Sequence, residues 1–179
     1  GKLIESTWDE IIDIVSTKIE QTEKNKIAGH VGDMQSLETI NSFKKLLGTV
    51  NIQDYDFREK PFYINPENKI NYIFNSSIKG IEDSDCIVLI GCNPRHEATM
   101  VNARIRKNFL SKKTPILSFG NAGDLTYDYS VVGNTTEDIK KFINKEIKYS
   151  NLFLKSKKPI IIIGESALEL DSGQFIFEN

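Results

Sequence analysis

Cysteine and histidine are scarce in this 179-residue chain, which contains two of each. An iron–sulphur cluster needs four protein ligands, so the two thiols cannot hold one. Cys86 and Cys92 flank one apolar stretch and would lie about 20 Å apart along an extended strand, which excludes a disulfide within it. We expect two buried free thiols. His30 and His96 show no metal-ligand spacing, so we expect no metal site.

Long apolar runs and a strong net charge are also missing. The formal net charge is −2 and neither half is strongly basic, which argues against nucleic acid as a partner. Apolar runs such as Ile160 to Ile163 are far shorter than the roughly 20 residues that span a bilayer. The start, Lys2 to Glu5, leads into an amphipathic segment and predicts no secretory signal. We therefore expect no nucleic-acid partner and no direct membrane insertion.

What the chain does contain is a hydrophobic pattern in which helices and strands alternate. Thr7 and Glu10 form a T-x-x-E capping box at the start of the first helix. Asp33 is expected to cap the second helix and Gly48 to end it in the left-handed conformation, while Thr136 caps the last. The pattern predicts helices near 8–20, 34–47, 94–110 and 136–147, strands near 26–31, 86–91, 115–119 and 159–163, and a loop over 120–134.

Four strands that alternate with helices predict an α/β fold: a parallel, Rossmann-like sheet with helices on both faces. Inward positions of the later helices are expected at Ala98, Val101, Ile105, Ile139, Phe142, Ile143 and Ile147. We expect residues 1–179 to form a single α/β fragment with an irregular excursion at about 49–77. Gln174–Phe177 is expected to add a strand or a helix. The pattern is typical of a truncated unit, which predicts an exposed apolar surface.

In such sheets, ligands bind beyond the carboxyl ends of the strands. The candidate loops are therefore Gly32–Asp33, Gly91–Arg95, Gly120–Asp124 and Gly164–Ser166. The glycine and helix start at Gly91–Arg95 suit either a phosphate or a plain strand-to-helix turn. A Rossmann G-x-G-x-x-G and a phosphate-binding G-x-x-x-x-G-K-[ST] loop are both absent. Gly164–Leu168 lacks the second glycine of a hydrolase nucleophile elbow.

One long motif resembles a known family. Ile87–Lys107 reads IVLIGCNPRHEATMVNARIRK and resembles the G-x-N-P-R-x-E-x-x-x-x-N-A-R-I-R-K segment of the large iron–sulphur subunit of NADH–quinone oxidoreductase (respiratory complex I). Shorter blocks agree in order: Asn75–Asp85, Asp124–Tyr127 (D-L-T-Y), Gly164–Leu168 (G-x-S-A-L), Ala28–Asp33 and Gly48–Asn51. The resemblance covers nearly the whole chain.

That subunit is similar to molybdopterin oxidoreductases, so the resemblance implies part of their α/β domain. It also implies a cofactor-binding site of vestigial character, built on Gly91, Asn93, Pro94, Gly120 and Asp124. In the molybdenum enzymes the G-x-N-P loop touches the pterin dinucleotide, and this loop is kept here. The iron–sulphur clusters of the subunit are expected upstream of Lys2, outside this fragment.

Two parts of a working pterin site are missing from the sequence. Gly120 and Asn121 stand where an acidic residue should bind the guanine. Phe57–Lys60 carries neither a thiol nor a hydroxyl where the metal ligand usually lies, and Glu59, between two cations, is interpreted as a salt-bridged surface group. We therefore expect molybdopterin to have been lost and no cofactor to remain in this fragment.

Three hypotheses follow. The first is a non-catalytic scaffold domain of the large iron–sulphur subunit, which lies peripherally on the cytoplasmic side of the bacterial inner membrane with other peripheral-arm subunits as partners. The alternative is a functional oxidoreductase domain that binds molybdopterin-guanine dinucleotide. The third is a free-standing α/β hydrolase or nucleotide-binding protein. The basic run of Arg104, Arg106, Lys107, Lys112 and Lys113 is interpreted as a solvated helix face or as a docking surface for an acidic subunit.

Overall fold

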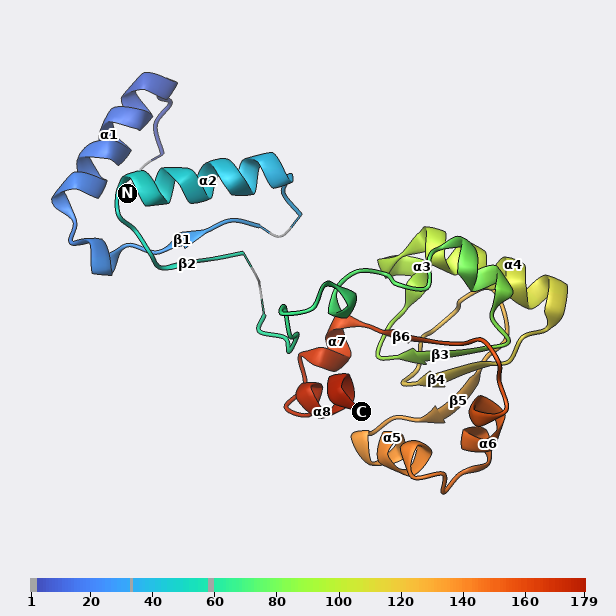
Figure 1. Ribbon diagram of the computed structural model, residues 1–179. Coiled ribbons are helices and arrows are strands. Elements are labelled where there is room, and N and C mark those ends of the chain that lie inside the picture. The colour runs from blue at the N-terminus through green and yellow to red at the C-terminus, as the bar shows by residue number, and fades with distance from the viewer. Residues whose placement is uncertain (1–2, 33, 58–59) are drawn as a thin grey trace. The chain divides into compact units, whose positions relative to one another are not determined.

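The computed structural model describes residues 3–32, 34–57 and 60–179. The chain divides into two compact units, residues 1–60 and 61–179, and each is described by itself (Figure 1). Asp33, the predicted helix cap, and Glu59, the residue considered as a metal ligand, lie outside the described residues. The expectation of one undivided fragment over 1–179 stays a prediction.

The smaller unit contains two helices and one short pair of parallel strands among its described residues. Its elements are α1 (Trp8–Gln21), a 3-10 turn (Lys24–Lys26), β1 (Gly29–His30), α2 (Leu37–Thr49) and β2 (Tyr55–Asp56). The predicted capping box is confirmed, because the Thr7 side chain accepts from Glu10 N–H and the Glu10 carboxylate accepts from Thr7 N–H.

The predicted ends of the second helix are wrong. Ser36, not Asp33, is the N-cap, and its hydroxyl accepts from Thr39 N–H at 3.2 Å. Gly48 is an ordinary helical residue, and the left-handed residue is Asn51, with φ 57°. Asparagine tolerates this conformation better than other residues with side chains.

The larger unit is built around a parallel four-stranded sheet with the order β5-β4-β3-β6 (Figure 1). Its elements are two 3-10 turns (Lys69–Asn71 and Lys79–Asp83), β3 (Cys86–Ile90), α3 (Pro94–Glu97), α4 (Thr99–Lys112), β4 (Ile116–Phe119), β5 (Ser130–Gly133), α5 (Thr136–Ile143), α6 (Lys148–Leu154), β6 (Pro159–Ile163), α7 (Glu165–Leu168) and α8 (Gly173–Glu178). The predicted parallel α/β class is confirmed.

The membership of this sheet differs from the prediction. The strand expected near 26–31 is β1, which pairs with β2 in the smaller unit. The fourth strand is instead β5, inside the segment expected to be a loop, and it pairs with β4 from Leu117 to Phe119. Its four residues, Ser130–Gly133, are too few for their hydrophobic pattern to stand out beside a Gly- and Asp-rich stretch.

Three helix predictions also need correction. The helix expected over 94–110 breaks at Ala98, which has φ −149° and an exposed side chain. Thr135, one residue before the predicted cap, is the N-cap of α5 and forms a capping box with Asp138. Ile147 lies outside that helix as the N-cap of α6. The segment Gln174–Phe177, expected to form a strand or a helix, lies within the helix α8.

Both faces of the sheet are covered by helices, as expected. Figure 1 shows α3 and α4 on one face and α5 and α6 on the other. Two separate hydrophobic clusters fill these layers, with Ile87, Leu89 and Ile105 in one and Val88, Leu117 and Ile139 in the other. The alternation of Ile87, Val88 and Leu89 between the clusters is the two-residue period of a strand that is buried on both faces.

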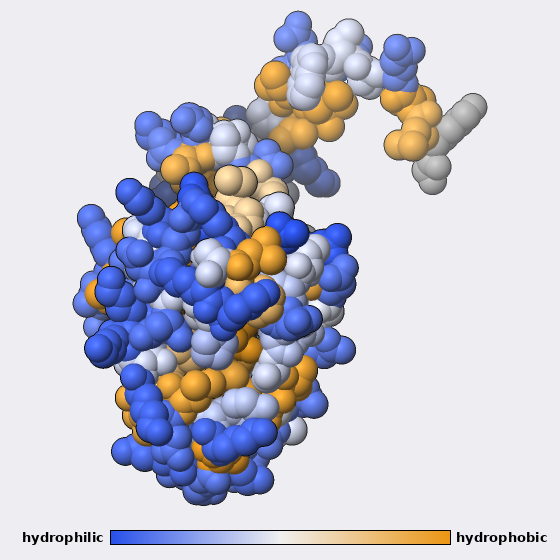
Figure 2. All heavy atoms as spheres, turned by 90° about the vertical axis from the view of Figure 1, so that its right-hand side faces the viewer, coloured by the Kyte–Doolittle hydropathy of each residue, from blue (hydrophilic) through white to orange (hydrophobic). Residues whose placement is uncertain are grey.

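Apolar side chains are exposed on the surface of both units. The apolar face expected of a truncated unit stays a prediction. Figure 2 shows exposed apolar side chains between hydrophilic ones on the face turned to the viewer. Large exposed examples are Trp8, Met34, Leu37, Ile70, Met100, Leu154 and Leu170. None of the helices in the described residues has the length and hydropathy needed to span a bilayer.

Candidate functional site

The carboxyl ends of β3, β4 and β6 meet at one edge of the larger unit. The strand β3 has its chain successor β4 on one side and the later β6 on the other, so the order reverses at β3. Such a reversal is where open α/β sheets form a crevice. A cavity of about 210 Å³ lies there, lined by Gly91, Cys92, Asn93, Glu97, Phe119, Gly120, Asn121 and Ser166. Three of the four predicted loops therefore come together, while Gly32 lies in the smaller unit.

Gly91 lets two loops pack against each other. Its φ of +55° suits glycine, and a Cβ there would lie 2.7 Å from the Cβ of Ala167 in α7. The hydroxyl of Ser166 donates a hydrogen bond to the Gly91 carbonyl. The space that glycine leaves free beside the backbone is thus filled by the chain's own helix α7.

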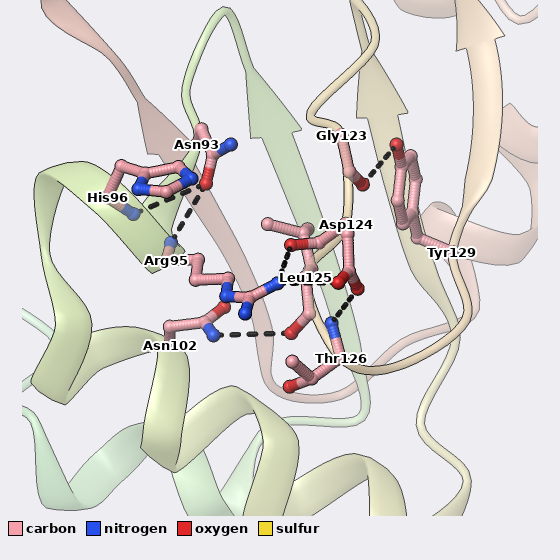
Figure 3. A network of polar contacts seen from close by, with 9 residues as sticks. All are labelled: Asn93, Arg95, His96, Asn102, Gly123, Asp124, Leu125, Thr126 and Tyr129. Carbon is pink, nitrogen blue, oxygen red and sulfur yellow. Dashed lines mark hydrogen bonds and ion pairs between the residues drawn. The ribbon is translucent and has the colours of Figure 1, made fainter.

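The backbone N–H groups at the start of α3 already have partners. Asn93 Oδ1 accepts from Arg95 N–H at 3.1 Å and from His96 N–H at 3.3 Å (Figure 3). The N–H of Asn93 donates to Glu97 Oε1 at 2.7 Å. A phosphate at this helix start would have to displace the Asn93 side chain and would meet the Glu97 carboxylate.

Arg95 and Asp124 join the loop after β3 to the loop after β4 (Figure 3). Arg95 Nη1 lies 2.5 Å from Asp124 Oδ2 and 3.0 Å from the Asp124 carbonyl oxygen. Asp124 Oδ1 also accepts from Thr126 N–H at 2.8 Å. The Thr126 N–H first, and Arg95 second, lower the pKa of Asp124, which keeps it ionised at neutral pH.

Two further contacts fix the segment after Gly120. Asn102 on α4 donates to the Leu125 carbonyl at 3.2 Å and accepts from Tyr127 OH at 2.7 Å. The Tyr129 hydroxyl lies 3.0 Å from both Asn121 Oδ1 and the Gly123 carbonyl. Burial is the main cause that raises the pKa of Tyr127, so its hydroxyl stays a hydrogen-bond donor.

The thiol that lines the cavity is a poor nucleophile. Burial, and then the Glu97 charge, raise the pKa of Cys92 to about 12. The other thiol, Cys86, is buried in the sheet, and burial raises its pKa as well. In the part of the chain that the structure describes, no group of three or more His, Cys, Asp or Glu side chains is arranged to hold a metal.

The five predicted site residues lie at this edge in different roles. Gly91, Asn93 and Gly120 line the cavity, whereas Pro94 is buried at the start of α3 and Asp124 pairs with Arg95. A Cβ at Gly120 would meet nothing within 4 Å, so this side of the cavity is open. Whether any of the five binds a cofactor stays a prediction.

Glu97 and Asn121 also line the cavity, although neither is among the predicted site residues. The spacing of Glu97, four residues after Asn93, was an available signal, because side chains at this spacing reach a helix start. Asn121 follows the glycine after β4, where ligand loops are expected. Ser166 was predicted near the edge, and it lines the cavity while its hydroxyl bonds the Gly91 carbonyl.

Much of the basic run packs α4 onto the 3-10 turn before β3. Glu82 pairs with Arg104, and its other oxygen lies 2.7 Å from Lys107 Nζ. Lys112 Nζ lies 2.5 Å from the Glu82 carbonyl oxygen, and Lys113 lies over the Phe109 ring. These contacts tie the basic run to its own unit, and the choice between a solvated helix face and a docking surface stays a prediction.

The chain belongs to the molybdopterin oxidoreductase family, which it matches over residues 1–179. It is 31% identical to the NADH-ubiquinone oxidoreductase 75 kDa subunit of Reclinomonas americana, over 96% of this chain and 27% of the relative. The NADH-ubiquinone oxidoreductase 78 kDa subunit of Neurospora crassa is 30% identical, over 99% of this chain and 24% of the relative. A subunit of the NADH-quinone oxidoreductase of Rickettsia bellii is 27% identical, over 98% of this chain and 26% of the relative.

The chain therefore spans about a quarter of the length of these curated relatives. The resemblance to the large subunit of NADH–quinone oxidoreductase, which the Ile87–Lys107 motif predicts, is confirmed.

Proposed function

We propose that this chain is a non-catalytic scaffold domain of the large iron–sulphur subunit of an NADH–quinone oxidoreductase, the enzyme that passes electrons from NADH to quinone. It contacts other peripheral-arm subunits on the cytoplasmic side of the bacterial inner membrane. The iron–sulphur clusters belong to other parts of the longer polypeptide. The relatives, which are subunits of this kind of oxidoreductase by name, support the assignment.

The observation that carries the scaffold role is that the chain's own groups occupy the ligand positions of the cavity. Asn93 Oδ1 takes two N–H groups of the helix start, and Glu97 takes a third. A pterin dinucleotide carries phosphates that need such donors.

The side chains around the cavity support the same conclusion. Glu97 contributes a negative charge where a phosphate would bind, and Asn121 is neutral where a guanine would need a carboxylate. The Cys92 thiol, with its raised pKa, is protonated at neutral pH. The residues present do not fit a pterin dinucleotide, and we infer that the loop has kept its backbone shape without its ligand.

Calorimetric titration of the chain with GDP tests the missing site. The expected result is no saturable heat, because neither the phosphates nor the guanine find free partners. The Glu97→Gln variant is the matched control, since glutamine keeps the acceptor for Asn93 N–H and removes the charge. Saturable binding of GDP by the unaltered chain would support the alternative, a working dinucleotide site.

The scaffold role has its own test in the assembled enzyme. Asn108 is buried far along α4 from the cavity, and its replacement by leucine should destabilise the domain. In the full-length subunit this change should lower the amount of assembled complex while the NADH:quinone turnover of each assembled complex stays unchanged. A fall in turnover at constant assembly would contradict a purely structural role.

A further inference from the structure

The outer edge of β6 is open. In the order β5-β4-β3-β6, this strand pairs only with β3, from Pro159 to Ile163. Among the described residues, no backbone hydrogen bond joins its other edge to any segment. The strand is apolar, with the sequence PIIII, and the Ile161 side chain is 49% exposed. Proteins usually shield such an edge with charges, proline or a covering segment.

The hydrogen-bond pattern shows which backbone groups point outward. The N–H of Gly164 donates to the Ile90 carbonyl, so alternate residues, Gly164 and Ile162, face β3. In a parallel ladder, the N–H and carbonyl of the residues between them point to the other side. These outward groups belong to Ile161 and Ile163.

A groove follows this edge. It has a volume of about 550 Å³ and is lined by Ile160–Ile163 of the strand and by Ile70–Ser76, together with Phe62, Leu168 and Phe177. The four β6 residues extend over roughly 13 Å at about 3.3 Å per residue. A groove of this length beside outward backbone groups suits a single extended segment.

We propose that this groove takes one extended segment, which adds a fifth strand to the sheet, parallel to β6, through the outward backbone groups of Ile161 and Ile163. The strand comes from another part of the longer polypeptide, of which this chain spans about a quarter in its relatives. The source of the strand thus rests on the proposed function, whereas the open edge does not.

The charges at the two ends of β6 indicate the end residues of the segment that this groove takes. Lys157 and Lys158 precede β6, and Glu165 follows it and lines the groove. A parallel strand therefore fits best with an acidic residue at its start and a basic one at its end.

A synthetic peptide tests the open edge on the whole chain. The probe is an acetylated peptide of about seven residues with alternating valine and threonine between an amino-terminal aspartate and a carboxyl-terminal lysine. Two further versions of this peptide carry N-methyl groups on alternate amides. In one version the methylated amides lie on one edge of the extended peptide, and in the other version they lie on the opposite edge. We expect one version to bind at least about ten-fold more weakly than the other, because only one edge pairs with β6.

Amide hydrogen exchange, followed by NMR, locates the binding. The unmodified peptide should slow exchange at Ile161 and Ile163 and leave the amides that already face β3 unchanged. The Ile161→Pro variant, which removes one outward N–H, should lose binding, and Ile161→Thr should keep it. If the proline variant fails to fold, the pair of methylated peptides still decides the question.

Equal affinity of the two methylated peptides, or no binding of the unmodified one, would overturn the proposal. Slow exchange at Ile161 and Ile163 in a dimer of the free chain would assign the edge to a second copy and overturn it as well. These outcomes are independent of the GDP titration, so a failed edge and a failed scaffold role are distinguishable.

Discussion

At the scale of single residues, Gly91 and Gly120 illustrate two different uses of glycine at one site. Both have positive φ, +55° and +96°, but only at Gly91 does the space for a Cβ hold another residue, Ala167. One glycine is therefore required by packing and backbone conformation together, and the other by backbone conformation alone.

This contrast predicts different costs for alanine at the two positions. Gly91→Ala should lower the free energy of unfolding by about 3 kcal/mol, since a positive φ costs about 1–2 kcal/mol and overpacking adds to it. Gly120→Ala should cost only about 1–2 kcal/mol, from the backbone alone. Urea unfolding of both variants measures the difference, and equal costs would show that contact with Ala167 has no energetic weight.

Cys92 carries a prediction about reactivity and pH. Its pKa is raised from 9.0 to about 12 by burial and by Glu97, so the native thiol should react with a disulfide reagent at pH 8 far more slowly than the unfolded chain does. A thiol whose pKa is higher in the folded state stabilises the fold at pH values below its unfolded pKa, and this contribution is lost as the pH rises from about 9 towards 12. Fast labelling of the native protein at pH 8 would contradict it.

Some of these residue roles could be predicted from sequence and others could not. Gly91 and Asn93 stand out because they follow a buried strand, where ligand loops and tight turns occur. The contact between Gly91 and Ala167, by contrast, joins residues 76 positions apart and depends on the pairing of β3 with β6. Local patterns do not contain that information.

At the scale of elements, α4 is held by buried polar side chains as well as apolar ones. Asn108 is 1% exposed, and its Nδ2 donates to the Ile81 carbonyl at 2.7 Å and to the Ser84 carbonyl at 3.0 Å. Thr114 Oγ1 donates to Asn108 Oδ1. This network fastens α4 to the turn that leads into β3.

Asn108→Leu should therefore destabilise the larger unit by about 3 kcal/mol, because it leaves buried carbonyl groups without donors. Asn151→Leu, at an exposed position of α6, is the control and should change stability by less than about 0.5 kcal/mol. Thermal unfolding followed by circular dichroism compares the two variants. A small effect at Asn108 would mean that water replaces its hydrogen bonds.

The elements themselves show where hydrophobic patterns succeed and fail. β3, β4 and β6 are predictable because each is a run of apolar residues buried in a parallel sheet. β5 is missed because it is short, and β1 is assigned to the wrong sheet because a pattern specifies a strand but not its partner. The break at Ala98 is missed because apolar spacing continues across it through Val101 and Ile105.

At the scale of the whole molecule, several carboxylates predict how stability depends on pH. Glu82, Asp85, Asp124 and Asp138 all have lowered pKa values, because hydrogen bonds and neighbouring cations favour the ionised forms. A carboxyl group whose pKa is lower in the folded state stabilises the fold at pH values above its unfolded pKa of about 4. This stabilisation is lost as the pH falls.

The melting temperature should therefore fall as the pH drops from about 5 to about 3. Asp85 accepts from the N–H groups of Lys157 and Lys158 at 2.7 and 2.9 Å, and thus fastens the start of β6. The Asp85→Asn variant should show a shallower acid dependence than the unaltered chain. A melting temperature that stays constant through this range would show that the carboxylates have similar pKa values in the folded and unfolded states.

We propose that the cavity between the loops after β3, β4 and β6 has kept the backbone of a pterin site, with internal partners in place of the cofactor. The most direct test is the molybdenum and tungsten content of the full-length polypeptide purified from its native source, combined with pterin fluorescence after oxidation. We expect both metals at background and no pterin. Stoichiometric molybdenum or tungsten together with released pterin would contradict the account.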